Sequence, residues 1–281
     1  MASKRLPEWI RKKMQYNRSF MATDEIINSH GIQTICTNAK CPNKGECWSR
    51  GTATVLIMGN ICTRNCPFCA VGHGKPEPLD MSEPERVAKM VKEMGITYLV
   101  ITSVDRDDLL DGGASQFRDV MDACRNMNDD IRFEILTPDF KGSQAKSLEI
   151  LSSALPFVFS HNIETVSRLY PTARPGGVYE RTLRLLNLAS IRYPNTPIKS
   201  SIMLGLGETE AEVIEVLEDL HEAGCTRVAM GQYLKPDRDS LEVKEYVTPE
   251  KFEWWEKTAR EIGFDWVMSS PFTRSSYHAD A

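Results

Sequence analysis

The sequence predicts an α/β fold, a partial TIM-type barrel of about six βα units with N- and C-terminal extensions packed on it. From residue 52 onward, short apolar or β-branched runs alternate with longer amphipathic segments, which is the pattern of βα units on a parallel sheet. The length of 281 residues suits one barrel-sized unit. Six units are about three-quarters of the complete eight-stranded form.

Six runs are predicted to be strands, and a plausible helix follows each of them: 52–59, 97–102, 132–137, 156–161, 198–204 and 227–233. Two helix starts carry the capping-box spacing, in which a hydroxyl and a carboxylate three residues apart satisfy each other's backbone N–H groups: Ser82 with Glu85, and Thr209 with Glu212. Gly95 and Gly224 are placed where helices should end.

The chain ends do not continue this alternation, so we interpret residues 1–50 and 234–281 as extensions that pack on a barrel formed by residues 51–233. The extensions contain four large apolar side chains that need burial, which argues against linkers: Trp48, Trp254, Trp255 and Trp266.

Composition excludes several classes of protein. The net charge of −5 is too small to indicate a nucleic-acid or membrane partner. No segment approaches the roughly 18 apolar residues of a membrane span, and the N-terminus lacks the apolar run of a secretory signal, so we expect a soluble intracellular protein. Six of the eight cysteines fall between residues 36 and 69. Such clustering in a reducing compartment indicates a metal centre rather than disulfides.

Cys62, Cys66 and Cys69 lie in a loop directly after the first predicted strand, at the barrel face where catalytic groups gather. Thiolates are the usual ligands of iron–sulfur clusters, and three cysteines on a four-iron cluster leave one iron open. The alternative is a structural zinc loop. Zinc would require a fourth ligand nearby, for which His73 is a poor candidate.

The spacing C-x3-C-x2-C, with the aromatic Phe68 before the last cysteine, resembles the signature of radical S-adenosylmethionine enzymes. The resemblance implies that S-adenosylmethionine chelates the open iron, and that one electron from the cluster splits its sulfonium to release a 5′-deoxyadenosyl radical. The missing fourth ligand of the loop is then the cofactor itself.

A second set, Cys36, Cys41 and Cys47, matches neither a zinc ribbon nor a redox pair. With both sets, the chain resembles the lipoyl synthase family over nearly its whole length. The resemblance rests on residues 36–47, 41–72, 103-SVDRDDLLDGGA-114, 161-HNIETV-166 and 274-RSSYHA-279.

This resemblance implies the insertion of two sulfur atoms at carbons 6 and 8 of a protein-bound octanoyl-lysine. The first cluster, on Cys62, Cys66 and Cys69, generates the radical. The second, on Cys36, Cys41 and Cys47, supplies the sulfur and is dismantled. By the family pattern Ser276 is its fourth ligand and belongs with the catalytic residues, whereas from the residues alone Ser275 and Ser276 could simply cap a turn.

Polar residues after the strands are candidates for binding S-adenosylmethionine, with solvated loops or helix caps as the alternative: Thr102, Ser103, Asp105, Asn162 and Glu164, together with Phe68. Arg174 and Tyr179 are weaker candidates for the substrate entrance. A surface salt bridge and a packed ring explain these two almost equally well.

The implied partners are octanoylated lipoyl carrier domains, namely the glycine cleavage H protein or the lipoyl domains of 2-oxoacid dehydrogenases. A small electron donor such as flavodoxin or ferredoxin and an iron–sulfur carrier that rebuilds the second cluster are also implied. We expect a cytoplasmic monomer. Two alternatives are another radical enzyme with an auxiliary cluster, such as a methylthiotransferase, and a non-catalytic electron carrier with two clusters.

Overall fold

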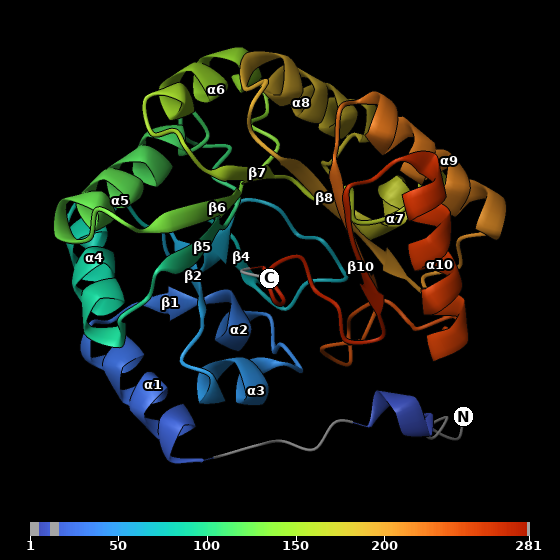
Figure 1. The fold of residues 1–281 in the computed structure, drawn as a ribbon, viewed down its shortest axis with the longest axis horizontal. Coiled ribbons are helices and arrows are strands. Elements are labelled where there is room, and N and C mark those ends of the chain that lie inside the picture. Colours follow the sequence, from blue (N-terminus) through green and yellow to red (C-terminus); the bar gives the residue numbers. More distant parts are fainter. Residues whose placement is uncertain (1–5, 12–16, 280–281) are drawn as a thin grey trace.

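The structure is a computed structural model that describes residues 6–11 and 17–279 of the chain. Its elements along the sequence (Figure 1) are η1 (Glu8–Ile10), α1 (Arg18–Ser29), β1 (Gln33–Thr34), α2 (Ile35–Asn38), α3 (Lys44–Ser49), β2 (Thr54–Ile57), β3 (Ile61–Cys62), β4 (Gly72–His73), α4 (Glu83–Met94), β5 (Tyr98–Ser103), α5 (Ala114–Met127), β6 (Arg132–Leu136), α6 (Gln144–Ser152), β7 (Val158–Ser160), η2 (Ser167–Leu169), α7 (Tyr170–Ala173), α8 (Tyr179–Arg192), β8 (Ile198–Leu204), α9 (Glu210–Glu222), β9 (Arg227–Gln232), α10 (Pro249–Ile262) and β10 (Trp266–Ser270).

The main sheet has eight strands in the order β1-β2-β5-β6-β7-β8-β9-β10. From β2 to β10 each neighbouring pair is parallel, whereas β1 pairs antiparallel with β2. The helices α4, α5, α6, α8, α9 and α10 form an outer arc around the curved sheet (Figure 1). This arrangement confirms the predicted partial barrel, because both faces of a parallel sheet need a cover: helices outside and packed side chains inside.

Each of the six predicted runs contains a strand, and the last βα unit is β9 followed by α10. The interpretation that residues 234–281 leave the alternation was wrong, because α10 lies there and β10 adds a further parallel strand beside β9, with Trp266 opposite Arg227. The sequence pattern did not predict this strand, because β10 is short and Val267 is its only buried residue. The division into 1–50, 51–233 and 234–281 stays a prediction.

Aromatic side chains pack α1 against α3 within the N-terminal segment. Trp48 is 1% exposed, and its ring lies 5.5 Å from that of Phe20. Trp255 is buried on α10, but Trp254 beside it is 39% exposed and Trp266 on β10 is half-buried, so the expectation that all four tryptophans are buried holds in full only for Trp48 and Trp255. Lys251 covers that indole with its ammonium 3.5 Å from the ring centroid, a cation–π contact that tolerates water.

One of the two predicted capping boxes is present. Thr209 and Glu212 satisfy each other's backbone N–H groups at the start of α9. The box at Ser82 was wrong, since the Ser82 hydroxyl donates to Asp80 instead, at 2.6 Å. Gly95 ends α4 in the left-handed conformation, as predicted. Among the described residues, no helix is long and apolar enough to cross a membrane.

Candidate active site

The two cysteine sets line one cavity of about 710 Å³. Cys62, Cys66 and Cys69 reach it from the loop after β2, and Cys36, Cys41 and Cys47 reach it from the segment before β2. Every other residue predicted to bind a cofactor or metal also lines this cavity: Phe68, Thr102, Ser103, Asp105, Asn162, Glu164 and Ser276. Residues from both ends of the chain and from the strand ends therefore meet at one place, although spacing alone predicted only the two triplets.

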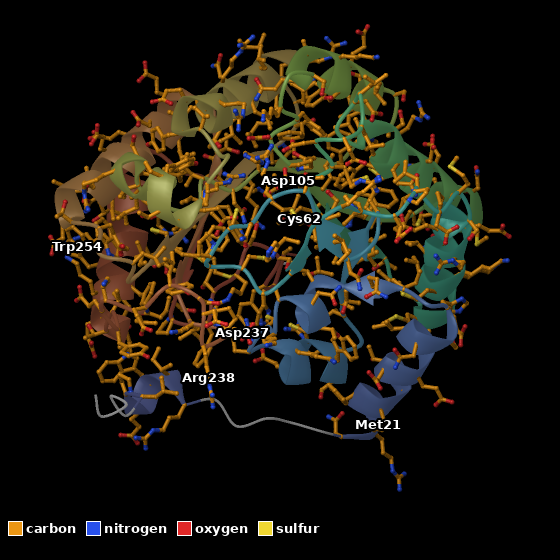
Figure 2. All side chains as sticks on the ribbon, turned by 180° about the vertical axis from the view of Figure 1, so that it is seen from behind. Met21, Cys62, Asp105, Asp237, Arg238 and Trp254 are labelled. Atoms are coloured by element: carbon orange, nitrogen blue, oxygen red, sulfur yellow. The ribbon has the colours of Figure 1, made fainter. Side chains whose placement is uncertain are left out.

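The first loop is shaped by backbone hydrogen bonds. Cys62 lies on β3, which pairs with β4, and the N–H of Cys69 donates to the carbonyl of Cys66 at 2.9 Å. The Cys62 sulfur accepts from the N–H groups of Arg64 and Asp105, at 3.4 and 3.3 Å. Figure 2 shows Cys62 and Asp105 side by side at the centre of the molecule. Hydrogen bonds to sulfur are a means of tuning cluster thiolates.

Burial raises the pKa of the thiols in this loop. The pKa rises to about 12 for Cys66, where the charge of Arg174 opposes the effect of burial, and to about 11 for Cys69, where the N–H of Val71 opposes it. Three neighbouring thiolates therefore need a compensating positive charge, which a bound metal centre supplies.

Arg64, within the loop, lies between three carboxylates that the sequence analysis did not group. Its guanidinium makes two hydrogen bonds to Asp139 (2.5 and 2.9 Å) and two to Asp107 (2.8 and 2.9 Å), and it lies 3.5 Å from Asp105. Burial would raise the pKa of Asp139, but the hydrogen bonds from Arg64 outweigh it and hold the pKa below its usual range. Because an arginine occupies the space between these carboxylates, they serve as an anchor for the loop.

The predicted cofactor-binding side chains differ in whether a protein group already satisfies their hydrogen-bonding capacity. Thr102 donates to the carbonyl of Leu136 at 3.1 Å and is thus already engaged. The buried hydroxyl of Ser103 has no hydrogen-bond partner among residues 6–11 and 17–279, so a polar ligand would satisfy it. Burial raises the pKa of Glu164, and the Arg174 charge opposes that rise.

Arg174 and Tyr179 were equal candidates for the substrate entrance, but only Arg174 lines the cavity. Arg174 is 6% exposed, lines the cavity and donates to the carbonyl of Asn162 at 3.0 Å. Tyr179 is not among the lining residues, and its hydroxyl donates to Asp219 at 2.7 Å. His161, which the sequence analysis did not single out, also lines the cavity. Burial together with the Arg174 charge lowers the pKa of His161 to about 3, so the ring is neutral.

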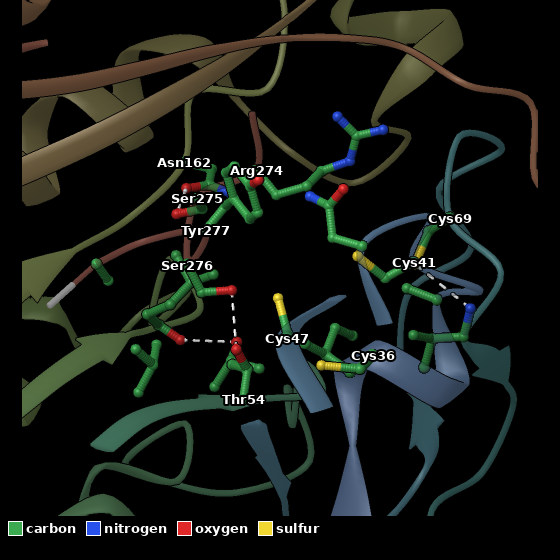
Figure 3. Close-up of a pocket in the computed structure, with 18 of the residues that line it drawn as sticks. Cys36, Cys41, Cys47, Thr54, Cys69, Asn162, Arg274, Ser275, Ser276 and Tyr277 are labelled. Atoms are coloured by element: carbon green, nitrogen blue, oxygen red, sulfur yellow. Dashed lines mark hydrogen bonds between the residues drawn. The ribbon is translucent and has the colours of Figure 1, made fainter. Parts of the chain in front are cut away.

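Ser276 lies beside the second cysteine set (Figure 3), on a C-terminal tail formed by residues 271–279. The tail crosses β9 closely at Gly231, where a Cβ atom would come within 2.0 Å of the Thr273 carbonyl. It is attached to α3 through Tyr277, whose hydroxyl donates to Glu46 at 2.7 Å, and to the loop after β7 through Ser275, which donates to Asn162 at 2.9 Å. The tail thus brings a serine oxygen to three cysteines that lie near the other end of the chain.

The sequence profile of the radical SAM superfamily matches residues 56–220. Among solved structures, the fold is similar to methylornithine synthase (PylB), with a TM-score of 0.58 and 13% identity over 90% of this chain and 77% of that one. It is also similar to the FeFe-hydrogenase maturase HydG, with a TM-score of 0.57 and 14% identity over 89% of this chain and 68% of that one. These likenesses support the fold alone.

Curated relatives extend the similarity over nearly the whole chain. The protein named lipoyl synthase from Laribacter hongkongensis is 50% identical over 276 residues, which are 98% of this chain and 88% of that protein. The lipoyl synthase of Nitrosococcus oceani is 49% identical over 98% of this chain and 85% of that protein. With identity at this level across the barrel and both terminal segments, the chain belongs to the lipoyl synthase family within the radical SAM superfamily.

Proposed function

We propose that this protein converts an octanoyl group, in amide linkage to a lysine of a lipoyl carrier domain, into a lipoyl group. Two C–H bonds, at carbons 6 and 8, are each exchanged for a C–S bond. The single observation that carries the proposal is that two cysteine triplets line one cavity, and that the second of them lies beside Ser276 (Figure 3). A methylthiotransferase and a two-cluster electron carrier, the two alternatives, gain no support from the relatives described above, which are named lipoyl synthase.

The cofactors of the family are S-adenosylmethionine and two 4Fe–4S clusters. The residues fit these groups, since each triplet offers three thiol donors, backbone N–H groups point at Cys62 and Cys69, and Ser103 has an unsatisfied buried hydroxyl. When bound, the first cluster with S-adenosylmethionine supplies radical hydrogen abstraction, and the second supplies sulfur. In our assignment Cys62, Cys66 and Cys69 hold the first cluster, and Cys36, Cys41, Cys47 and Ser276 hold the second.

The chain's own groups exclude water and orient the reactants. Apolar side chains line the cavity within the barrel and suit an alkyl chain: Val100, Leu136 and Met203. Arg174 offers a buried positive charge on the same wall. We assign the carboxylate of S-adenosylmethionine to this charge, because Arg174 is a buried cation in the lining of the cavity that holds both cysteine sets. A mostly apolar cavity limits the contact of a carbon radical with solvent before the radical meets sulfur.

The partner protein that carries the octanoyl group is a lipoyl carrier domain. Whether it is the glycine cleavage H protein or a 2-oxoacid dehydrogenase domain stays a prediction. The same holds for flavodoxin or ferredoxin as electron donor, for the iron–sulfur carrier, for the monomeric state and for the cytoplasmic location.

The test is anaerobic reconstitution of the full chain with iron and sulfide. We expect about eight irons per chain, and deoxyadenosine formed only when an octanoylated carrier peptide is present. Mass spectrometry of the peptide should show two sulfur atoms in place of two hydrogens. A protein that takes up only zinc, or that makes deoxyadenosine without adding sulfur to the peptide, would contradict the proposal.

A further inference from the structure

The hydroxyl of Thr54 donates a hydrogen bond to the oxygen of Ser276 at 2.9 Å. The contact joins strand β2 to the C-terminal tail, across 222 positions of sequence, and Figure 3 shows it at the edge of the cavity, with the Cys47 sulfur nearby. Neither the resemblance nor the sequence pattern pointed to Thr54. The contact is of interest because Ser276 is the proposed fourth metal ligand of the second cysteine set.

Thr54 is held rigidly. It is 6% exposed and pairs with Val100 in the parallel ladder between β2 and β5. A β-branched side chain in a strand has few accessible rotamers, so the direction of its hydroxyl follows from the backbone. Thr54, Cys36 and Ser276 all line the same cavity. Thr54 therefore contacts Ser276 from a fixed position in the sheet.

The backbone of the tail is placed by other contacts. The hydroxyl of Ser275 donates a hydrogen bond to Asn162, and the hydroxyl of Tyr277 donates one to Glu46. The side-chain amide of Asn43 donates to the carbonyl of Phe272 at 2.7 Å. These bonds fix where residue 276 lies but leave its χ1 angle undetermined, and serine has three staggered rotamers. The bond from Thr54 selects among them, and because Ser276 is the acceptor, its oxygen keeps a further lone pair for a metal.

We propose that Thr54 is a positioning residue of the second cluster. Its hydroxyl holds the Ser276 oxygen toward Cys36, Cys41 and Cys47, so that the iron bound by serine stays in place until sulfur is consumed. A serine oxygen matches iron less well than a thiolate does, and such a bond depends strongly on pre-orientation by a neighbouring group. This inference rests on the proposed function, in which Ser276 is a ligand.

The experiment uses the full chain with Cys62, Cys66 and Cys69 replaced by alanine, so that only the second cluster is loaded. The readout is the rate at which a ferrous chelator removes the first iron, and it is independent of turnover. Removing a partner that orients a ligand typically costs 10- to 100-fold in metal affinity, so Thr54→Val should lose iron about tenfold faster or more. Thr54→Ser, which keeps the hydroxyl, should stay within about twofold of the parent.

Two reference variants separate the explanations. Ser276→Ala removes the ligand and should lose iron at least as fast as Thr54→Val. Thr165→Val makes the same substitution at a threonine that is 1% exposed, outside the cavity lining, with a hydroxyl that has no partner within residues 6–11 and 17–279. It should behave as the parent. Circular dichroism of the metal-free proteins checks the fold, and Thr54→Ala replaces Thr54→Val if the latter does not fold.

The iron-loss rates of the variants distinguish failure of the positioning role from failure of the proposed function. If Ser276→Ala loses iron faster but Thr54→Val matches the parent, the positioning role is wrong and the proposed function is untouched. If Ser276→Ala itself matches the parent, serine is not a ligand and that part of the proposed function fails as well. Equal acceleration by Thr165→Val, or by Thr54→Ser, would mean general loosening and would also overturn the inference.

Discussion

Ser275 and Asn162 are joined by a hydrogen bond of 2.9 Å, and Asn162 in turn donates to Glu164 at 3.2 Å. The C-terminal tail, which lies beside the second cysteine set, is thereby linked to Glu164, which lines the same cavity as the first set. We predict that Ser275→Ala weakens this attachment by about 1 kcal/mol, the net value of one such bond.

Hydrogen exchange measures this effect. Backbone amides of the tail should exchange about fivefold faster in Ser275→Ala, as 1 kcal/mol implies. The control is Ser29→Ala on α1, where an exposed hydroxyl donates to the carbonyl of Ile26. Unchanged protection of the tail in Ser275→Ala would show that Tyr277 and Asn43 hold it without help.

Arg64→Met should destabilise the protein strongly. The variant removes the cation that lies between three carboxylates, and the fully buried Asp139 then keeps only Arg181 as an ion-pair partner. Breaking a buried ion pair on one side typically costs about 3–5 kcal/mol. Urea denaturation of the metal-free protein measures the loss.

The matched control for Arg64→Met is Arg168→Met. Arg168 pairs with Glu212, but its side chain is 55% exposed, and exposed pairs contribute about 1 kcal/mol or less. Equal losses in the two variants would contradict the view that the three-carboxylate site anchors the loop.

His161 should make stability depend on pH. Its folded-state pKa is lowered to about 3 from the ordinary value of 6.5, so between these values the unfolded chain binds a proton that the native state does not. The stability from this group is fully present above pH 6.5 and falls as the pH decreases, by up to about 1.4 kcal/mol per pH unit.

Urea denaturation at several pH values between 7 and 4.5 tests this sign. His161→Gln should have a shallower loss of stability on acidification than the parent, while His73→Gln, at an exposed site on β4, should follow the parent. Parallel curves for the parent and His161→Gln would mean that His161 takes up a proton in the native state.

Ser276→Cys should keep the second cluster but impair sulfur insertion. A thiolate binds iron more firmly than a serine oxygen does, so the iron that must leave stays in place. We expect lipoyl formation in a single turnover to fall by about tenfold or more, with an unchanged iron content. Ser275→Cys, one residue away, is the control for an added thiol. Full activity of Ser276→Cys would contradict the idea that a weak oxygen ligand aids release.

The barrel could be predicted from the sequence because its strands are buried on both faces and read as apolar runs, such as Thr54–Ile57. The strand Trp266–Ser270 lacks this signal, since four of its five residues are partly exposed. The Ser82 cap failed for a local reason, because Asp80 competes for the same hydroxyl. A spacing rule does not include such a competitor.

The two cysteine triplets were visible because their members are close in sequence. Arg64 and Asp139 are 75 positions apart, and Thr54 and Ser276 are 222 apart, so only the folded sheet brings them together. A run such as 103-SVDRDDLLDGGA-114 holds several carboxylates, and the sequence does not tell which of them meets an arginine.

The tail that carries Ser276 also bears on when the second centre can be built. A ribosome adds about 5–20 residues per second, so the 222 positions between Thr54 and Ser276 take roughly 10–45 seconds of translation. During that interval the nascent chain displays three thiols without their oxygen partner. With Ser276 as the proposed fourth ligand, a cluster delivered during that interval would be held by an incomplete set, so we expect productive loading only after residue 276 has been synthesised and has docked.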